Sequence, residues 1–557
     1  NIPFGFFGDT KPVTGGAIVP DDPTSELSDD YMYGSSNTFV VRPFALSVDF
    51  ESGDGPIVAD RDTGTNQSVA ADEDGSLYRK AGENFAALVS SVAWQAADDC
   101  NLDGQPDDGS EVDGMSQSCD EADLLDNPVT PSFYRDSQGL LNAYRIKLDV
   151  VSNQAENDGG VRGVLDSDIL NRSNFANYGV DGVGRLETNY NEVGIIDIDA
   201  ELVDFSEDPT TYLSTDAVIG RAKDVGRFYP ERFDIVNVSL TPRVEASCSP
   251  PSTFTYMGEP FGLNIELVAR NVQGQTTENY RAGFAKLDEY DDLNLKAIEE
   301  VTGNDNNDLT VRLSNDTMPA TYQAQWSAVN GGELELEGNV IFERANPADP
   351  DGPFEDLIIA FVPTDSDGVT LAASDLDTEI TEGDEDYSEI ARHDYYYGRL
   401  IVDNAYGPET ENLPITFRVE YFDGERFVIN TADDCTIISA AELDLLPGTY
   451  TSDLDSGETS IVTPGAPEFN NGLVNGTESA SNPTDAPMTA TAPGEGNSGT
   501  VDIELDLDAL GLPFLRYSWP HEGNDYDDNP RARLEFGVFR NHDRLINWQE
   551  VYNGATP

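Results

Sequence analysis

The chain has 557 residues, and its 105 acidic and 31 basic side chains give a formal net charge of −74. This charge excludes the usual modes of binding to nucleic acids and anionic membranes, because both depend on basic patches, and it attracts divalent cations. Hydrophobic residues still make up 38% of the chain, including 25 Phe and 23 Tyr, so folded domains are expected and not a disordered acidic tail.

Strand patterns dominate along the chain. Alternating polar and apolar residues predict half-buried strands at 144–150, 196–202 and 501–507. An apolar run at 357–362 predicts a fully buried strand, and Asp423-Gly424 predicts a hairpin over 417–429. The best helical pattern, at 293–301, is short. No apolar run has the length of about 18 residues that a membrane span needs, so we expect none in this chain.

Two stretches of the chain share one pattern. Residues 81–94 (AGENFAALVSSVAW) and 257–270 (MGEPFGLNIELVAR) have Gly, Glu, Phe, Val and Ala in the same register. Each stretch is typical of a turn that leads into a strand with alternating apolar residues. The repeat indicates two related β-domains that differ mainly in their loops.

The repeat and the composition together predict the domain organisation. We expect an all-β chain of tandem immunoglobulin-like β-sandwich domains plus a C-terminal β-rich domain. The expected divisions are an N-terminal extended segment (1–36), a first β-sandwich with an inserted acidic loop (37–225), a second β-sandwich (226–362), and a C-terminal β domain (363–557) with a long loop at 456–500. The first residue is Asn1, so we expect a processed or partial polypeptide.

An acidic loop in the first domain carries the clearest chemistry. Its oxygen-bearing residues occupy positions 1, 3, 5, 7 and 9, namely Asp99, Asn101, Asp103, Gln105 (through its carbonyl) and Asp107. Gly104 at position 6 permits the sharp turn with which such a loop wraps Ca²⁺. Ser110 replaces the Glu expected at position 12, and Glu111 follows it, so a dockerin-like or thrombospondin-repeat-like calcium loop is favoured over an EF-hand. The alternative is a solvated acidic turn.

Two other acidic turns fit calcium less completely. They are Asp365 and Asp367 with the carbonyl of Val369, and the group Asp525, Asp527 and Asp528.

Four cysteines, Cys100, Cys119, Cys248 and Cys435, are even in number and form no C-x-x-C. Two disulfides in an oxidising compartment are therefore expected, with free thiols as the alternative. Cys100 is expected to pair with Cys119 and close the acidic loop, which leaves Cys248 to pair with Cys435. A zinc site is not expected, because the three histidines are scattered.

Much of the chain resembles the MshQ-like family, whose members are encoded with the mannose-sensitive haemagglutinin (MSHA) type IV pilus. The matching stretches are GRFYP at 226–230, FTYMGEPF at 254–261, TTENY at 276–280, GFAKL at 283–287, DGPF at 351–354, DSDGV at 365–369, YGRL at 397–400, YFDG at 421–424, DDCT at 433–436, LPFLRY at 512–517, NPRAR at 529–533 and HDRLI at 542–546. The resemblance implies a secreted or surface protein near pilus genes and brings no established chemistry with it.

Function is expected to be structural. The chain has no nucleophile elbow, Walker loop, H-E-x-x-H or dinucleotide fingerprint, so we expect no enzyme. We expect an extracellular surface, filament or pilus-associated protein with an adhesive role. Its partners would be further copies of itself or pilus and surface proteins. The alternatives are a calcium-dependent carbohydrate-binding protein with a glycan ligand, and a secreted carbohydrate-active enzyme.

Overall fold

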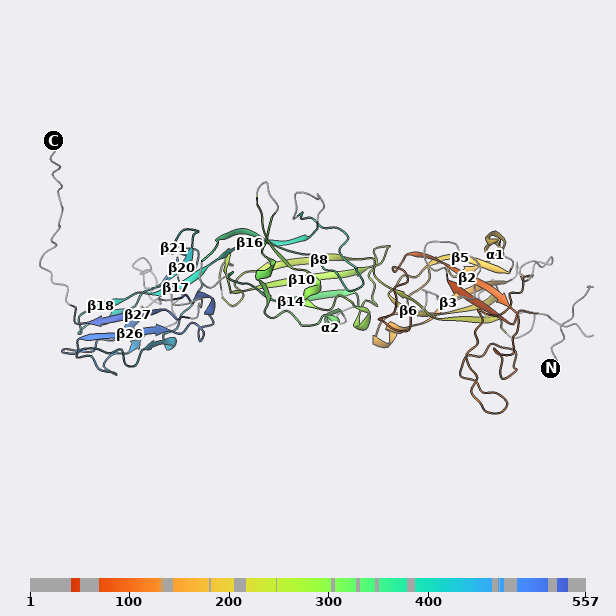
Figure 1. The fold of residues 1–557 in the computed structure, drawn as a ribbon, viewed down its shortest axis with the longest axis horizontal. Coiled ribbons are helices and arrows are strands. Elements are labelled where there is room, and N and C mark those ends of the chain that lie inside the picture. The colour runs from red at the N-terminus through yellow and green to blue at the C-terminus, as the bar shows by residue number, and fades with distance from the viewer. Residues whose placement is uncertain are drawn as a thin grey trace, which may run out of the picture.

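The computed structural model describes residues 42–50, 70–131, 133, 144–179, 182–204, 217–246, 248–301, 306–326, 331–345, 350–377, 386–462, 469, 471–474, 488–518 and 528–538. Within these ranges the chain is nearly all β, and its three β domains lie end to end in an extended rod (Figure 1). The predicted N-terminal segment 1–36 lies outside the described residues.

The first domain packs a sheet of three strands against a sheet of four. The first sheet has the order β1 (Ala45–Phe50), β2 (Asn84–Val92) and β5 (Val183–Asn189), and the second has β4 (Ile169–Leu170), β3 (Tyr144–Asn153), β6 (Gly194–Asp204) and β7 (Ile219–Phe228). α1 (Arg172–Tyr178) precedes β5. The predicted strands at 144–150 and 196–202 are confirmed within β3 and β6. In β6, Ile196, Ile198 and Ala200 point into the core, whereas the carboxylates between them stay partly exposed.

The second domain packs a four-stranded sheet against a five-stranded one. The four-stranded sheet has the order β13 (Leu313–Asn315), β14 (Glu333–Phe342), β10 (Pro260–Arg270) and β8 (Arg232–Thr241). The five-stranded sheet has the order β12 (Asn307–Asp308), β11 (Lys296–Glu299), β15 (Phe354–Phe361), β16 (Ser388–Tyr396) and β9 (Phe254–Tyr256). α2 (Gln323–Trp326) buries Trp326 in the core between the sheets.

Two sequence-based expectations for this domain are wrong. The helical pattern at 293–301 contains β11, because Lys296 and Ile298 pair with Ala360 and Ile358 of β15, and this tertiary pairing overrides a weak local preference. The domain also continues past the expected boundary at residue 362, since β16 pairs with β15 in the same sheet. The buried strand predicted at 357–362 is confirmed as β15.

The third domain contains three small sheets around one core. The first sheet has the order β17 (Gly398–Val402), β20 (Phe417–Phe422) and β21 (Phe427–Ile429), and β24 (Leu473–Val474) also pairs with β20. The second has the order β18 (Ala405–Gly407), β27 (Arg531–Phe536), β26 (Gly499–Leu505) and β22 (Leu443–Leu445). The third has the order β19 (Leu413–Pro414), β25 (Thr489–Ala490) and β23 (Ile461–Val462). The predicted hairpin is confirmed, with Phe422 opposite Phe427. The predicted loop at 456–500 is interrupted by short strands, and its residues 463–468, 470 and 475–487 lie outside the described ranges.

Short 3-10 helices occur at Gln154–Asp158, Ala282–Phe284, Tyr290–Leu293, Thr310–Arg312, Ala440–Glu442 and Pro513–Leu515. Among the described residues, no helix combines the length and the apolar character needed to cross a bilayer.

The sequence repeat corresponds to one structural device used twice. Gly82 and Gly258 both have positive φ, 82° and 88°, which a Gly adopts at little cost. In each copy the Glu that follows donates its amide to the carbonyl of the residue three positions earlier, and its carboxylate accepts that residue's amide. Each turn leads into an inner strand of a sheet, β2 in one domain and β10 in the next.

A polar network joins the first domain to the second. The carboxylate of Glu192 accepts the backbone amides of Glu278 and Asn279, both at 3.1 Å. The side chain of Asn279 in turn donates to the carbonyl of Val161 at 2.7 Å and accepts the Val161 amide at 2.6 Å. Val193 of the first domain belongs to the core of the second. The first two domains are therefore held by buried hydrogen bonds and by a shared apolar core.

One continuous run of chain joins the second domain to the third. β16 ends at Tyr396 and β17 begins at Gly398, so a nearly unbroken strand passes from one sandwich into the next (Figure 1). Tyr395 and Tyr397 belong to the second core, whereas Tyr396 packs against the third. The side chains of this strand thus alternate between two cores, which holds the two domains at a fixed angle.

A buried guanidinium lies at the same junction. Arg243, which follows β8, contacts both carboxylate oxygens of Glu259 at 3.0 Å and Oδ1 of Asp433 in the third domain at 3.1 Å. Its guanidinium carbon lies 5.0 Å from the ring centres of Phe254 and of Tyr256. All three charged side chains are at most 1% exposed. Water is excluded from this site, so the attraction between the guanidinium and the two carboxylates is strong. Removing any one of these charges would leave another buried without its partner.

We predict that Arg243→Met lowers the free energy of unfolding by about 3–5 kcal/mol, because it leaves two buried carboxylates without their cation. Urea titration followed by circular dichroism measures the change. The matched control is Arg533→Met, which removes an exposed ion pair with Asp502 and should change stability by less than about 1 kcal/mol. Equal effects of the two substitutions would contradict the role of the buried cluster.

A second prediction concerns pH at the first junction. Burial raises the pKa of Glu192 to about 7, against an ordinary value of 4.5, although backbone amides partly oppose the rise. The folded protein therefore holds this proton more tightly than the unfolded chain, and that contribution to stability disappears as pH rises from about 4.5 to about 7. As pH rises from 5 to 8, the free energy of unfolding of Glu192→Gln should increase by about 3 kcal/mol relative to that of the parent. A pH-independent difference would contradict this.

Candidate metal centre

The acidic loop lies in an insertion, residues 93–131, that follows β2 in the first domain. The insertion projects from the side of this domain near one end of the rod (Figure 1). It contains eleven acidic residues and no Lys or Arg. Two cations of the sandwich reach it: Arg42 donates to the carbonyl of Gly104 at 2.8 Å, and Lys223 pairs with Glu121 at 2.6 Å. Among the described residues, most of its carboxylates form no ion pair with a Lys or Arg.

Side-chain oxygens hold the loop in a tight curve. Oδ2 of Asp99 accepts the amide of Gly104 at 3.1 Å, Oδ1 of Asn101 accepts the amide of Asp103 at 2.9 Å, and Oδ1 of Asp103 accepts the amide of Gln105 at 2.8 Å. Gly104 has φ 86°, as the turn requires. The predicted residues at positions 1, 3 and 5 therefore line the inside of one turn, as the sequence pattern indicates.

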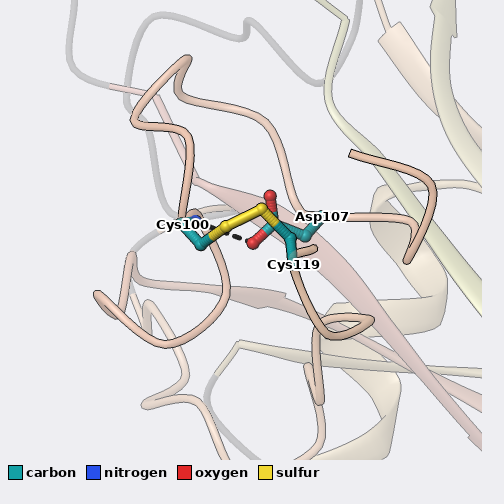
Figure 2. Close-up of side chains that lie close together, drawn as sticks. All are labelled: Cys100, Asp107 and Cys119. Carbon is teal, nitrogen blue, oxygen red and sulfur yellow. Dashed lines mark hydrogen bonds between the residues drawn. A yellow bond between two sulfur atoms is a disulfide. The ribbon is translucent and has the colours of Figure 1, made fainter. Parts of the chain in front are cut away.

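Asp107 closes the loop beside a disulfide. Its Oδ2 accepts the amide of Cys100 at 2.7 Å, and Cys100 is bonded to Cys119 (Figure 2). These three residues form a group whose possible ligand atoms lie within 4.8 Å of one another, and it is the only such group of His, Cys, Asp or Glu among the described residues. Because the two sulfurs are bonded to each other, they are no thiolate ligands. The three aspartate carboxylates of the loop are not gathered this closely.

Buried oxygens without a hydrogen-bond partner concentrate in this short segment. They are one side-chain oxygen each of Asp98, Asp99, Gln105, Asp107 and Glu111. Asp99 and Asp107 are each only 3% exposed and use their other oxygen to hold the backbone. A buried carboxylate oxygen without a partner is unfavourable, so this arrangement suits a cation that prefers oxygen ligands.

Glu111 is a candidate ligand that the motif places one position late. The calcium pattern expects Glu at the position of Ser110, yet the structure places the Glu111 carboxyl beside that of Asp107, where the two groups share a hydrogen bond only when Glu111 carries a proton. This contact, together with burial and the charges of Asp103, Asp107 and Asp108, raises the pKa of Glu111 to about 7. Sequence spacing alone cannot reveal this contact, because a one-residue shift still reaches the loop when the chain turns back.

The other acidic turns have different outcomes. Asp365 accepts the amides of Asp367 and Val369 and the hydroxyl of Tyr280, and Asp367 pairs with Arg227 of the first domain. These oxygens already have partners, so this turn belongs to the junction between the domains. Of the third group, Asp525 and Asp527 lie outside the described residues.

Both disulfides join the pairs expected from the sequence. Cys100 bonds to Cys119 within the insertion, and Cys248 of the second domain bonds to Cys435 of the third. Arg243 donates to Sγ of Cys435 at 3.4 Å, so the second disulfide lies against the buried charge cluster.

Among solved structures, the chain is similar to the adhesin FdeC of Escherichia coli, with 10% identity, 82% of this chain and 93% of that chain covered, and a TM-score of 0.29. The chain is also similar to the cadherin-like domains 1 to 4 of zebrafish RET, with 9% identity and a TM-score of 0.19. This match covers 90% of this chain and 95% of that chain. TM-scores this low carry no argument about function. No curated protein matches the chain.

Domain families give a clearer result. The second, third and fourth domains of DUF6701 match residues 42–184, 192–390 and 396–551, respectively. The last division falls where β16 ends and β17 begins, whereas the first falls between β5 and β6, so that the third-domain match includes β6 and β7 of the first sandwich. Since the matches together span most of the sequence, the chain belongs to the DUF6701 family.

Proposed function

We propose that this chain is a non-catalytic extracellular or cell-surface protein that acts as a stiff structural and adhesive element of a filament or pilus-associated assembly. The observation that carries this proposal is the pair of buried junctions. Domains joined by exposed linkers move independently, whereas these share cores, a strand and buried ion pairs. A rod of fixed length holds whatever lies at one end at a fixed distance from the other.

Several features support a location outside the cytoplasm. Two disulfides persist in oxidising compartments, and the MshQ-like resemblance points to the neighbourhood of a type IV pilus. The absence of catalytic motifs from the sequence removes the usual reasons to expect a reaction. Hydrolysis of a defined glycan, abolished by replacing one Asp or Glu, would overturn the non-catalytic proposal.

We further propose that the insertion binds Ca²⁺ through Asp99, Asn101, Asp103, Gln105 and Asp107, with Glu111 as an added ligand. Calcium takes six to eight oxygen ligands, and carboxylates, amide oxygens and carbonyls all serve. The unpartnered oxygens of Asp99, Gln105, Asp107 and Glu111 support the proposal. The bound ion would supply the positive charge that the insertion lacks.

Calcium should stabilise the insertion, and a hundredfold excess over Kd corresponds to about 2.7 kcal/mol. We predict that a chelator lowers the melting temperature of the parent and leaves that of Asp103→Asn unchanged, since Asn keeps the turn and loses the charge. Trp94 provides a local signal, because its indole donates to Asp99 at 2.8 Å and its emission should change on binding. Asp120→Asn, an exposed change in the same insertion, is the control. If the chelator leaves the melting temperature of the parent unchanged, the loop is an ordinary acidic turn that binds no calcium.

Self-association should depend on ions. Copies with a charge of −74 repel each other, and salt shortens that repulsion to about 8 Å at physiological ionic strength. We predict that scattering and electron microscopy show straight rods that associate in saline calcium buffer and separate on chelation or dilution of the salt. A chain that stays monomeric at high concentration in that buffer would contradict the filament proposal. A bent or variable particle would contradict the stiff rod.

A second candidate function is calcium-dependent carbohydrate binding. A hollow of about 220 Å³ lies between the insertion and strands β6 and β7, lined by Asp107, Asp108, Asp199, Arg221 and other residues. Asp107 borders both this hollow and the proposed calcium loop, so a ligand there would be sensitive to the ion. A glycan array with and without chelator distinguishes this function from a purely structural one.

A further inference from the structure

The carboxylate of Asp107 lies against the disulfide between Cys100 and Cys119 (Figure 2). One ligand atom of each residue, namely two sulfurs and a carboxylate oxygen, lies within 4.8 Å of the other two. Asp107 is 3% exposed, and its Oδ1 is buried without a hydrogen-bond partner. A buried carboxylate oxygen without a partner is unfavourable, so this group of side chains lacks a donor or a cation.

Hydrogen bonds other than the disulfide also hold the three residues together. Oδ2 of Asp107 accepts the amide of Cys100 at 2.7 Å. The amide of Cys119 donates to the carbonyl of Glu111 at 2.9 Å, and the amide of Ala122 donates to the carbonyl of Asp107 at 2.9 Å. Both cysteines are therefore tied to the segment that carries Asp107. Breaking the S–S bond leaves these contacts in place, so the two sulfurs would stay close to the carboxylate.

Two thiolates and a carboxylate form a ligand set for zinc. Zn²⁺ binds Cys sulfur at about 2.3 Å and Asp oxygen at about 2.0–2.2 Å in tetrahedral geometry, which places two ligating sulfurs about 3.8 Å apart. The sulfurs of a broken disulfide reach this separation by moving apart by about 2 Å. A water molecule would fill the fourth position. Ca²⁺ and Mg²⁺ prefer oxygen ligands, so the thiolates favour the softer ion.

The charges around the two disulfides differ. Arg243 donates to Sγ of Cys435 at 3.4 Å, so a cation bound to the sulfurs of Cys248 and Cys435 would face a fixed positive charge. The insertion that holds Cys100 and Cys119 has eleven acidic residues and no Lys or Arg. Its field attracts cations. Of the two pairs of cysteines, only the pair in the insertion therefore combines a carboxylate ligand with favourable surroundings.

We infer that reduction converts the disulfide of the insertion into a zinc site, with Cys100, Cys119 and Asp107 as its ligands. A trialkylphosphine is a suitable reductant: the S–S bond takes up two electrons and two protons, and the phosphine becomes a phosphine oxide with the oxygen of one water molecule. Zn²⁺ then displaces the two thiol protons. The inference goes beyond the proposed calcium function and does not depend on it, although both sites use Asp107. The insertion is closed by an S–S bond when oxidised and by a metal ion when reduced.

Co²⁺ is the probe, because it occupies zinc sites and absorbs in the near ultraviolet when thiolates bind it. In anaerobic buffer with the phosphine, the parent should show this absorption and saturate at one ion per chain, whereas the oxidised parent should show none. Cys248→Ser/Cys435→Ser should keep the absorption, and Cys100→Ser/Cys119→Ser should lose it. Asp107→Asn should keep the thiolate absorption and bind at least about tenfold more weakly. Circular dichroism checks that each variant folds.

Three outcomes would overturn the inference. The first is a reduced parent without thiolate absorption. The second is absorption that survives in Cys100→Ser/Cys119→Ser, because the metal would then lie at the other pair of cysteines. The third is a failure of excess Zn²⁺ to displace Co²⁺, since zinc binds such ligands more tightly than cobalt does. None of these results bears on the calcium proposal, which is tested on the oxidised protein.

Discussion

The scarcity of positive charge governs how this protein is held together. With 31 basic side chains against 105 acidic ones, most carboxylates have no counterion within the chain. Two arginines lie at the domain junctions. Arg227 pairs with Asp367 between the first two domains, and Arg243 joins Glu259 to Asp433 between the last two. These cations offset the cost of burying the carboxylates beside them, whereas Glu192 at the first junction accepts backbone amides and has a raised pKa.

Arginine suits this task better than lysine for a geometric reason. Its planar group donates in several directions at once and stacks on aromatic rings. Arg344 shows both properties: it donates to the carbonyl of Gly398 at 2.8 Å and to that of Arg516 at 3.0 Å, and its guanidinium carbon lies 4.2 Å from the ring centre of Tyr397. A single side chain thereby ties the second domain to two segments of the third. A lysine has one ammonium group and cannot make these contacts together.

The sequence predicts the local features of this fold better than the long-range ones. Alternation at 196–202 and the Asp423-Gly424 turn depend on neighbouring residues, and both strand and hairpin form as expected. The helix predicted from the short pattern at 293–301 is wrong, because pairing with β15 makes part of this segment a strand. The partners of Arg243 could not be predicted, since Asp433 lies 190 residues away and nothing local marks either residue.

The candidate metal centre divides in the same way. Spacing identifies Asp99, Asn101 and Asp103, because ligands on one turn follow a fixed pattern. It misses Glu111, whose position depends on how residues 93–131 fold back on themselves. An unpartnered oxygen of Glu111 reveals it, which a motif search does not consider.

The buried carboxylates of the rod and those of the insertion are neutralised in different ways. Inside the rod, fixed arginines neutralise Asp367, Glu259 and Asp433, whereas the raised pKa of Glu192 lets a proton neutralise that side chain. The insertion has eleven acidic residues and no cation of its own, and two residues of the sandwich supply the charge or donors that reach it. Monovalent salt screens exposed charges but does not replace a counterion in a dry site. Only a multivalent ion or a proton can complete these buried groups, and therefore the insertion is the part of the chain whose order depends on what the surroundings provide.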